Sequence, residues 1–165
     1  VGTLVHDALI PGKRLWFFAT GTGFAPFASL LRAPQTYEDY DEVIITHTCR
    51  TAGELTYGHD LIEALKTDEL LNEVIGEGFW KKIKYYPTTT REESPKMGRI
   101  TDLINSGEAY KDLDVDPLNP EHDRAMICGN LAFNLELKDM LEAAGLEEGA
   151  NSKPMQYVVE KAFLD

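Results

Sequence analysis

The sequence predicts an α/β protein built on a doubly wound, mostly parallel five-stranded sheet with helices on both faces. Apolar runs of strand length alternate with segments of helical spacing, which is typical of successive βαβ units. The first run, LWFFAT, is continuously apolar, as a strand covered on both faces requires. It leads directly into the glycine-rich turn TGTG and then into a helix with a proline near its start. Together these features indicate a Rossmann-like domain.

Five segments have the composition of strands, with apolar or β-branched residues between polar stretches. The third contains Pro87, where we expect the strand to stop because proline cannot donate a hydrogen bond to its neighbour. The predicted strands are Leu15–Thr20, Glu42–Thr48, Lys81–Pro87, Arg124–Gly129 and Gln156–Phe163.

Helical segments lie between these strands and are recognised by apolar spacing and capping residues. Pro26 suits the first turn of a helix, where its missing N–H costs nothing. Thr101 and Asn130 are expected N-caps, and Gly145 is expected to end the last helix. The predicted helices are Pro26–Arg32, a segment from near Thr56 or Tyr57 to Lys66, Asp68–Ile75, Asp102–Ser106 and Leu131–Ala144.

Composition argues against several classes of protein. The 165 residues include 16 lysines and arginines against 28 aspartates and glutamates, a net charge of −12. Nucleic acid is therefore not expected as a partner, since phosphate binding needs a basic face. We expect no membrane span, because no run of about 18 apolar residues occurs. Cys49 and Cys128 lie far apart and the histidines are scattered, so we expect no metal centre, no disulfide and a cytoplasmic location.

The organisation along the chain is simple. Residues 1–14, which end in IPGKR, have the character of a connector, and residues 15–165 are long enough for one well-buried domain. The sequence starts with Val1 instead of methionine, from which we expect a further segment before it.

The place to search for a site is the carboxyl edge of the predicted sheet. In doubly wound sheets, ligands bind beyond the carboxyl ends of the strands, where the strand order reverses. Every unusual polar group of this sequence falls at one of five strand exits, namely Thr20–Pro26, His47–Arg50, Thr88–Arg91, Cys128–Asn130 and Glu160–Phe163.

The first exit has the character of a diphosphate cradle. Gly21 and Gly23 allow a sharp turn and a close approach of the backbone to a ligand. Thr20 and Thr22 add hydroxyl groups, and the start of the following helix favours anions. The turn is not GxGxxG, because Pro26 stands third after Gly23, and it is not a P-loop. An ordinary tight turn between strand and helix is the alternative interpretation.

Several motifs together resemble the ferredoxin–NADP reductase family, bacterial type. They are GTGFAPF, THTCR, TTTRE, GRIT, CGN and VVEKAF, in this order along the chain. The resemblance implies the NADP(H)-binding C-terminal domain of a flavoenzyme that exchanges electrons with ferredoxin or flavodoxin. It also implies FAD, held mainly by a β-barrel domain that precedes this one, with Gly2 and Thr3 at the FAD diphosphate.

Three arginines favour NADP(H) over NAD(H) independently of the resemblance. An NAD site usually ends its second strand with an acidic residue, whereas here that strand runs into Arg50. Arg91 leaves the third strand and Arg99 follows it, so all three guanidinium groups can meet at one edge and bind a phosphate. The alternative is that they are solvated surface cations. The resemblance assigns them, with the neighbouring Thr90, to the 2′-phosphate of NADP(H).

The resemblance also implies the residues at the reacting end. Cys128 and Glu160 would lie against the nicotinamide and the flavin and help to position them, although burial in the core is the ordinary interpretation of such a cysteine. Plant-type members end in a tyrosine stacked on the flavin, whereas Ala162 takes that place here and the chain continues. The other cofactor-binding residues that the resemblance implies are Pro26, Gly129, Asn130, Ala162 and Phe163.

Two other functions fit the same sequence. One is an NAD(P)H reductase component of the same architecture that serves an oxygenase or a cytochrome. The other is a nucleotide-binding module without catalysis, which acts as a sensor.

Overall fold

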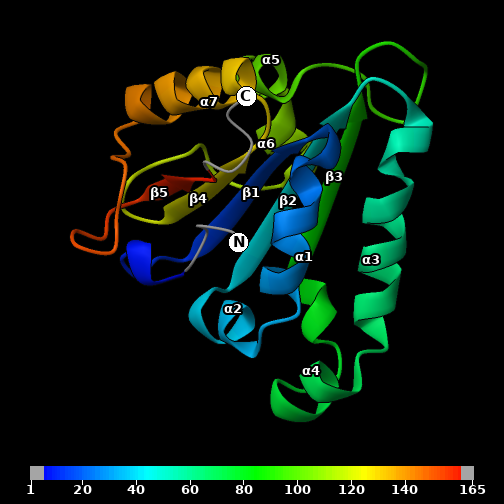
Figure 1. The fold of residues 1–165 in the computed structure, drawn as a ribbon, viewed down its shortest axis with the longest axis vertical. Coiled ribbons are helices and arrows are strands. Elements are labelled where there is room, and N and C mark those ends of the chain that lie inside the picture. Colours follow the sequence, from blue (N-terminus) through cyan, green and yellow to red (C-terminus); the bar gives the residue numbers. More distant parts are fainter. Residues whose placement is uncertain (1–5, 161–165) are drawn as a thin grey trace.

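A computed structural model describes residues 6–160 and contains one sheet of five parallel strands in the order β3-β2-β1-β4-β5 (Figure 1). The order reverses between β1 and β4, which makes their carboxyl ends the topological switch point. The strands are β1 (Arg14–Thr20), β2 (Glu42–Cys49), β3 (Ile83–Thr89), β4 (Asp123–Cys128) and β5 (Tyr157–Val159). The predicted fold class is confirmed.

Seven α-helices and four short 3-10 helices connect the strands within the described residues. The α-helices are α1 (Ala25–Leu31), α2 (Pro34–Asp39), α3 (Thr56–Lys66), α4 (Glu69–Val74), α5 (Ile100–Asn105), α6 (Glu108–Leu113) and α7 (Leu131–Ala143). The 3-10 helices are η1 (His6–Ala8), η2 (Gly21–Phe24), η3 (Ala52–Leu55) and η4 (Phe79–Lys82).

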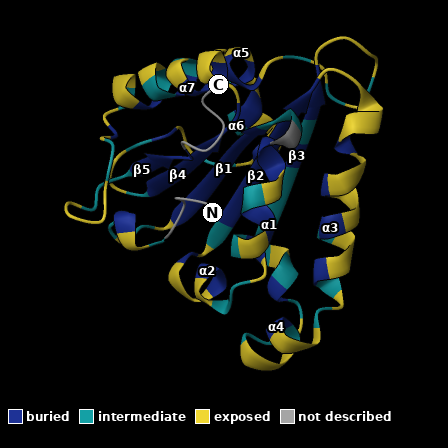
Figure 2. Ribbon diagram, viewed as in Figure 1, coloured by how far each residue is buried: buried dark blue, intermediate teal, exposed yellow. Residues whose placement is uncertain are grey.

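Strand β1 is buried on both faces, as its continuous apolar run predicts. Phe17 and Ala19 belong to one apolar cluster, which is completed by residues of α1 to α4. Trp16 and Phe18 point to the other face and join residues of α5, α6 and α7. The sheet is therefore the middle layer of three. Figure 2 shows the inner strands buried between helices with exposed outer faces, while the edge strand β3 is in part only of intermediate burial.

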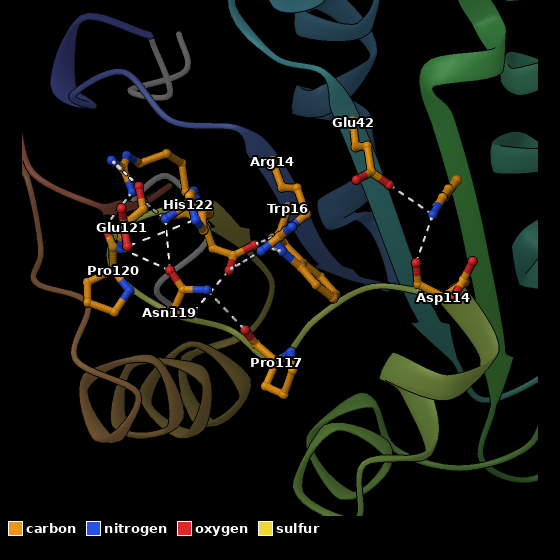
Figure 3. A network of polar contacts seen from close by, with 12 residues as sticks. Arg14, Trp16, Glu42, Asp114, Pro117, Asn119, Pro120, Glu121 and His122 are labelled. Carbon is orange, nitrogen blue, oxygen red and sulfur yellow. Dashed lines mark hydrogen bonds and ion pairs between the residues drawn. The ribbon is translucent and has the colours of Figure 1, made fainter.

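A buried ion pair ties β1 to β4 at the amino edge of the sheet (Figure 3). Arg14 Nε lies 2.8 Å from Asp123 Oδ1, and Trp16 Nε1 donates to the same oxygen at 2.8 Å. The backbone N–H of Asn119 donates to the other carboxylate oxygen at 2.9 Å. With several donors around it, the buried carboxylate is well compensated. This edge lies opposite the carboxyl ends of the strands.

Several boundaries differ from the predictions by one or more residues, and two of these differences have clear physical reasons. Strand β3 continues through Pro87 to Thr89, because it is the edge strand and β2 is its single neighbour in the sheet. Helix α5 begins one residue before Thr101, with Arg99 as N-cap, and the Thr101 hydroxyl instead donates to Glu136 on α7. Helices α2 and α6 have no counterpart among the predicted elements.

The longest helix was predicted well. The Asn130 side chain accepts the backbone N–H of Phe133 at 2.9 Å, so it is the N-cap of α7. Gly145 follows the helix with φ +96°, a left-handed conformation that favours glycine. The last strand, β5, is shorter than predicted, because Gln156 and Glu160 lie outside it, and residues 161–163 of the predicted range lie outside the described residues.

Residues 6–160 contain no helix that is long and apolar enough to cross a membrane. The same residues contain no cluster of histidine, cysteine and carboxylate side chains that could hold a metal ion.

Candidate functional site

A cavity of about 910 Å³ opens at the carboxyl ends of β1 to β4, at the switch point of the sheet. Nine of the residues predicted for a cofactor line it together: Thr20, Gly21, Gly23, Arg50, Thr90, Arg91, Arg99, Gly129 and Asn130. They come from four different strand exits, separated by up to 110 positions in the sequence, so the fold is what unites them.

Thr20 ends β1, and Gly21, Thr22 and Gly23 form the short helix η2 together with Phe24, directly before α1. Gly21 has φ +49°, and a Cβ placed on it would meet no atom within 4 Å. Glycine is therefore favoured there by backbone conformation, on the open side of the turn.

Gly23 lines the cavity and also has a packing role that was not predicted. A Cβ on Gly23 would lie 2.1 Å from the carbonyl oxygen of Cys128, and a Cβ on Gly129 would lie 2.5 Å from the Thr20 hydroxyl oxygen. Both glycines are needed because the turn after β1 and the turn after β4 pack against each other. This close packing of two turns forms one wall of the cavity.

His47 contacts the turn after β1 through a hydrogen bond and was not predicted as a site residue. Its Nε2 lies 3.0 Å from the carbonyl oxygen of Gly21 and 3.2 Å from the Cys49 sulfur. A carbonyl oxygen only accepts, so Nε2 carries the hydrogen. Burial lowers the pKa of His47, which keeps the ring neutral at pH 7. A lone histidine in an otherwise apolar and β-branched strand was the available signal.

The three predicted arginines line the same cavity, Arg50 from the segment after β2 and both Arg91 and Arg99 from the loop between β3 and α5. Arg50 follows β2 and Arg91 follows β3. The backbone N–H of Arg91 donates to the backbone carbonyl oxygen of Arg50 at 3.0 Å. The chain then returns beside β3, where the Gly98 N–H donates to the Thr89 carbonyl oxygen at 2.8 Å. This return places Arg99, the next residue, at the same wall.

The arginines differ in their ionic partners. Arg50 lies 3.9 Å from a carboxylate oxygen of Glu54, and Arg99 pairs with Glu136. Arg91 pairs with no carboxylate among residues 6–160. Glu54 and Glu136 were not singled out from the sequence.

Cys128 and Glu160 lie near each other at the ends of β4 and β5, both fully buried. The Glu160 N–H donates to the carbonyl oxygen of Ile127 at 2.8 Å. Burial, reinforced by the charge of Glu160, raises the pKa of the Cys128 thiol to about 12. The thiol therefore stays protonated, and neither residue is among those that line the cavity.

The remaining predicted residues are placed as follows. Pro26 lies in the first turn of α1 and does not line the cavity, and Thr22 belongs to η2. Gly2, Thr3, Ala162 and Phe163 lie outside the described residues.

Comparison with known proteins identifies the family. Residues 17–138 match the model of the oxidoreductase NAD-binding domain. The chain belongs to this family. Within it, the chain is 62% identical over 164 residues to a flavodoxin/ferredoxin–NADP reductase of Rhodobacter capsulatus, covering 99% of the chain and 59% of the relative. It is 46% identical to ferredoxin–NADP reductase A of Sorangium cellulosum, covering 98% of the chain and 57% of the relative.

A solved structure shares the fold of this NAD-binding domain over almost the whole length of the present chain. It is a ferredoxin NADP⁺ reductase from Neisseria gonorrhoeae with bound FAD and NADP, 28% identical, with a TM-score of 0.79 over 97% of the chain and 60% of that protein. The resemblance expected from the sequence motifs is confirmed. The chain spans about three fifths of the length of these relatives.

The residues of the cavity fit a phosphorylated dinucleotide. Its volume lies in the range of small-molecule and cofactor sites, about 300–1,000 Å³. Its polar lining combines three guanidinium groups with threonine hydroxyls and the N-terminal end of α7, which suit anionic oxygens, and includes one acid, Glu54, next to Arg50. The chemistry of these donors matches phosphate groups.

Proposed function

We propose that this chain is the NADP(H)-binding part of a cytoplasmic, FAD-dependent ferredoxin–NADP reductase. The full protein would transfer hydride between NADPH and FAD and exchange single electrons with ferredoxin or flavodoxin. The observation that carries the proposal is the convergence of Arg50, Arg91 and Arg99 on one cavity beside a glycine turn at the switch point.

The glycine turn would hold the diphosphate. Thr20, Gly21, Thr22 and Gly23 stand at the end of the central strand, directly before α1. The open side of the turn at Gly21 leaves room for a ligand to approach the backbone, since nothing lies within 4 Å of the Cβ position.

The arginine wall would hold the adenosine 2′-phosphate. Arg91 is the primary ligand in this proposal, because it is the arginine of the three without a carboxylate partner among residues 6–160. Arg50, Arg99 and Thr90 complete the wall. A guanidinium group donates a planar fork of hydrogen bonds, which matches the oxygens of a phosphate.

The nicotinamide end would lie at the exit of β4. Gly129 and Asn130 line the cavity there, while Cys128 and Glu160 form the buried layer next to them. With its protonated thiol, Cys128 would position the ring by packing and would not act as a nucleophile. When bound, NADPH supplies the hydride, and the chain contributes orientation.

The remaining parts of the function depend on a segment beyond this chain. The relatives are longer than the chain, which leaves room in the full protein for the proposed FAD-binding domain before residues 1–14. Gly2, Thr3, Ala162 and Phe163 are the residues proposed to reach the flavin.

The test is an acceptor assay on the full protein. We expect purified protein to be yellow with FAD and to reduce ferredoxin or flavodoxin with NADPH. Reduction of an oxygenase component or a cytochrome, with no turnover of either carrier, would favour the rival reductase. Binding of NADPH without flavin and without electron transfer would favour the sensor.

A further inference from the structure

Glu136 on α7 holds one side of the arginine wall. Its Oε2 accepts from Nη2 of Arg99, and its Oε1 accepts from the hydroxyl of Thr101. Thr101 is buried in the first turn of α5, so the carboxylate is fixed at two points. Glu136 itself does not line the cavity, whereas Arg99 and Thr101 do.

Arg99 is paired through a single nitrogen. A guanidinium group has five N–H donors, and only Nη2 donates to Glu136, which leaves the other donors able to face a ligand. Arg99 is also 56% exposed as a side chain, so a ligand in the cavity can reach it. A phosphate bound by Arg99 would therefore share this cation with a carboxylate.

The charge of Glu136 is stable near neutral pH. The hydrogen bond from Thr101, followed by that from Arg99, lowers the pKa of its carboxyl group. The carboxylate therefore repels a second anion that binds at Arg99. The other acid at the wall, Glu54, lines the cavity itself and lies 3.9 Å from Arg50. Its carboxylate accepts hydrogen bonds from the backbone N–H and hydroxyl of Thr51, and none from Arg50.

We propose that Glu136 is a specificity-determining residue that acts through Arg99 and weakens the preference of the site for a nucleotide with a 2′-phosphate. The inference rests on the proposed NADP(H) function of the cavity. The effect is electrostatic and falls on the phosphate alone, because a nucleotide without this phosphate places no anion at Arg99. Because the oxidised and reduced forms of the cofactor carry the same 2′-phosphate, Glu136 would weaken the binding of both forms equally.

The test uses two small nucleotides, 2′,5′-ADP and 5′-ADP, which differ in the phosphate at issue. Their dissociation constants are measured by calorimetry for the 165-residue chain and for Glu136→Gln. This change removes the charge, while the amide oxygen can still accept from Arg99 and the amide N–H can donate to the hydroxyl oxygen of Thr101. We expect Glu136→Gln to bind 2′,5′-ADP about three- to tenfold more tightly and 5′-ADP equally well. High salt should reduce the gain, since screening weakens the repulsion that was removed.

Glu63→Gln is the matched control. It makes the same change in net charge and likewise removes a carboxylate paired with a cation, here 3.2 Å from Lys66 on α3 and outside the cavity. It should leave both dissociation constants unchanged.

The outcomes separate this inference from the proposed function. If the wild-type chain binds 5′-ADP as tightly as 2′,5′-ADP, the proposed NADP(H) site is wrong. If the wild type prefers 2′,5′-ADP but Glu136→Gln binds it equally or more weakly, the role assigned to Glu136 is overturned. Weaker binding would identify Glu136 as a residue that only orients Arg99.

Discussion

The ring nitrogen Nε2 of buried His47 lies 3.0 Å from the carbonyl oxygen of Gly21, which belongs to the turn proposed to hold the diphosphate. This hydrogen bond connects β2 to the one residue of the turn with a left-handed backbone. The Gly21 peptide, which lines the cavity, is thus held by a buried side chain that does not line it.

Replacing His47 tests that support. We expect His47→Phe to weaken NADP⁺ and NAD⁺ binding alike, by about two- to tenfold, because one neutral hydrogen bond contributes about 0.5–1.5 kcal/mol. Calorimetric titration of the chain measures both constants. His122→Gln, at a half-exposed position near the amino edge, is the control and should change neither. Unchanged dissociation constants in His47→Phe would show that the His47 hydrogen bond does not support nucleotide binding.

The same histidine makes stability depend on pH. Burial lowers the pKa of His47 and of His6 below the ordinary value of 6.5, so the unfolded chain binds more protons than the folded chain once the pH falls below about 6.5. The free energy of unfolding should therefore decrease as pH falls from 7 toward 5. Urea denaturation at each pH measures it, and the slope should be smaller in His47→Phe. An identical slope would show that His47 does not contribute to it.

Gly23 tests the packing of the two turns. A Cβ at this position would lie 2.1 Å from the Cys128 carbonyl oxygen, so Gly23→Ala should reduce the free energy of unfolding by about 1–3 kcal/mol. Gly53→Ala is the matched control, because a Cβ there would meet nothing within 4 Å and φ is not positive. Equal stability of the two variants in urea denaturation would contradict the close contact between the turns.

The strand pattern and the strand exits were predictable because they follow from local rules. The run LWFFAT is apolar at every position up to Thr20, which already indicates burial on both faces of the strand. Phe17 and Phe18 are accordingly buried on opposite faces. Asn130 caps the start of α7 with its own side chain, and Gly145 ends the helix because glycine favours the left-handed backbone conformation. Such signals need no knowledge of the partner elements.

Other features depend on which segments become neighbours. Pro87 stays in a strand only because β3 is at the edge, and the sequence gives no direct sign of strand order. Thr101 bonds to Glu136 instead of capping its own helix, since α7 packs beside α5. Gly23 and Gly129 look like ligand-binding glycines, yet their tightest contacts are with each other's turns.

The central claim is that the arginine wall recognises the 2′-phosphate. Arg91 carries most of this claim, because it has no carboxylate partner among residues 6–160 and lines the cavity. A hydrogen bond to a charged group contributes about 1.5–3 kcal/mol, so its loss should weaken NADP⁺ binding by about 10- to 100-fold. Arg32→Ala, at an exposed position next to α1 and outside the cavity, serves as the control for the loss of a positive charge.

The most direct measurement is therefore the pair of dissociation constants for NADP⁺ and NAD⁺, determined by calorimetry for the wild-type chain, Arg91→Ala and Arg32→Ala. We predict that the wild type and Arg32→Ala prefer NADP⁺, and that Arg91→Ala loses most of this preference while its NAD⁺ constant stays the same. An unchanged NADP⁺/NAD⁺ ratio in Arg91→Ala, or a wild type that prefers NAD⁺, would contradict recognition of the 2′-phosphate at this wall.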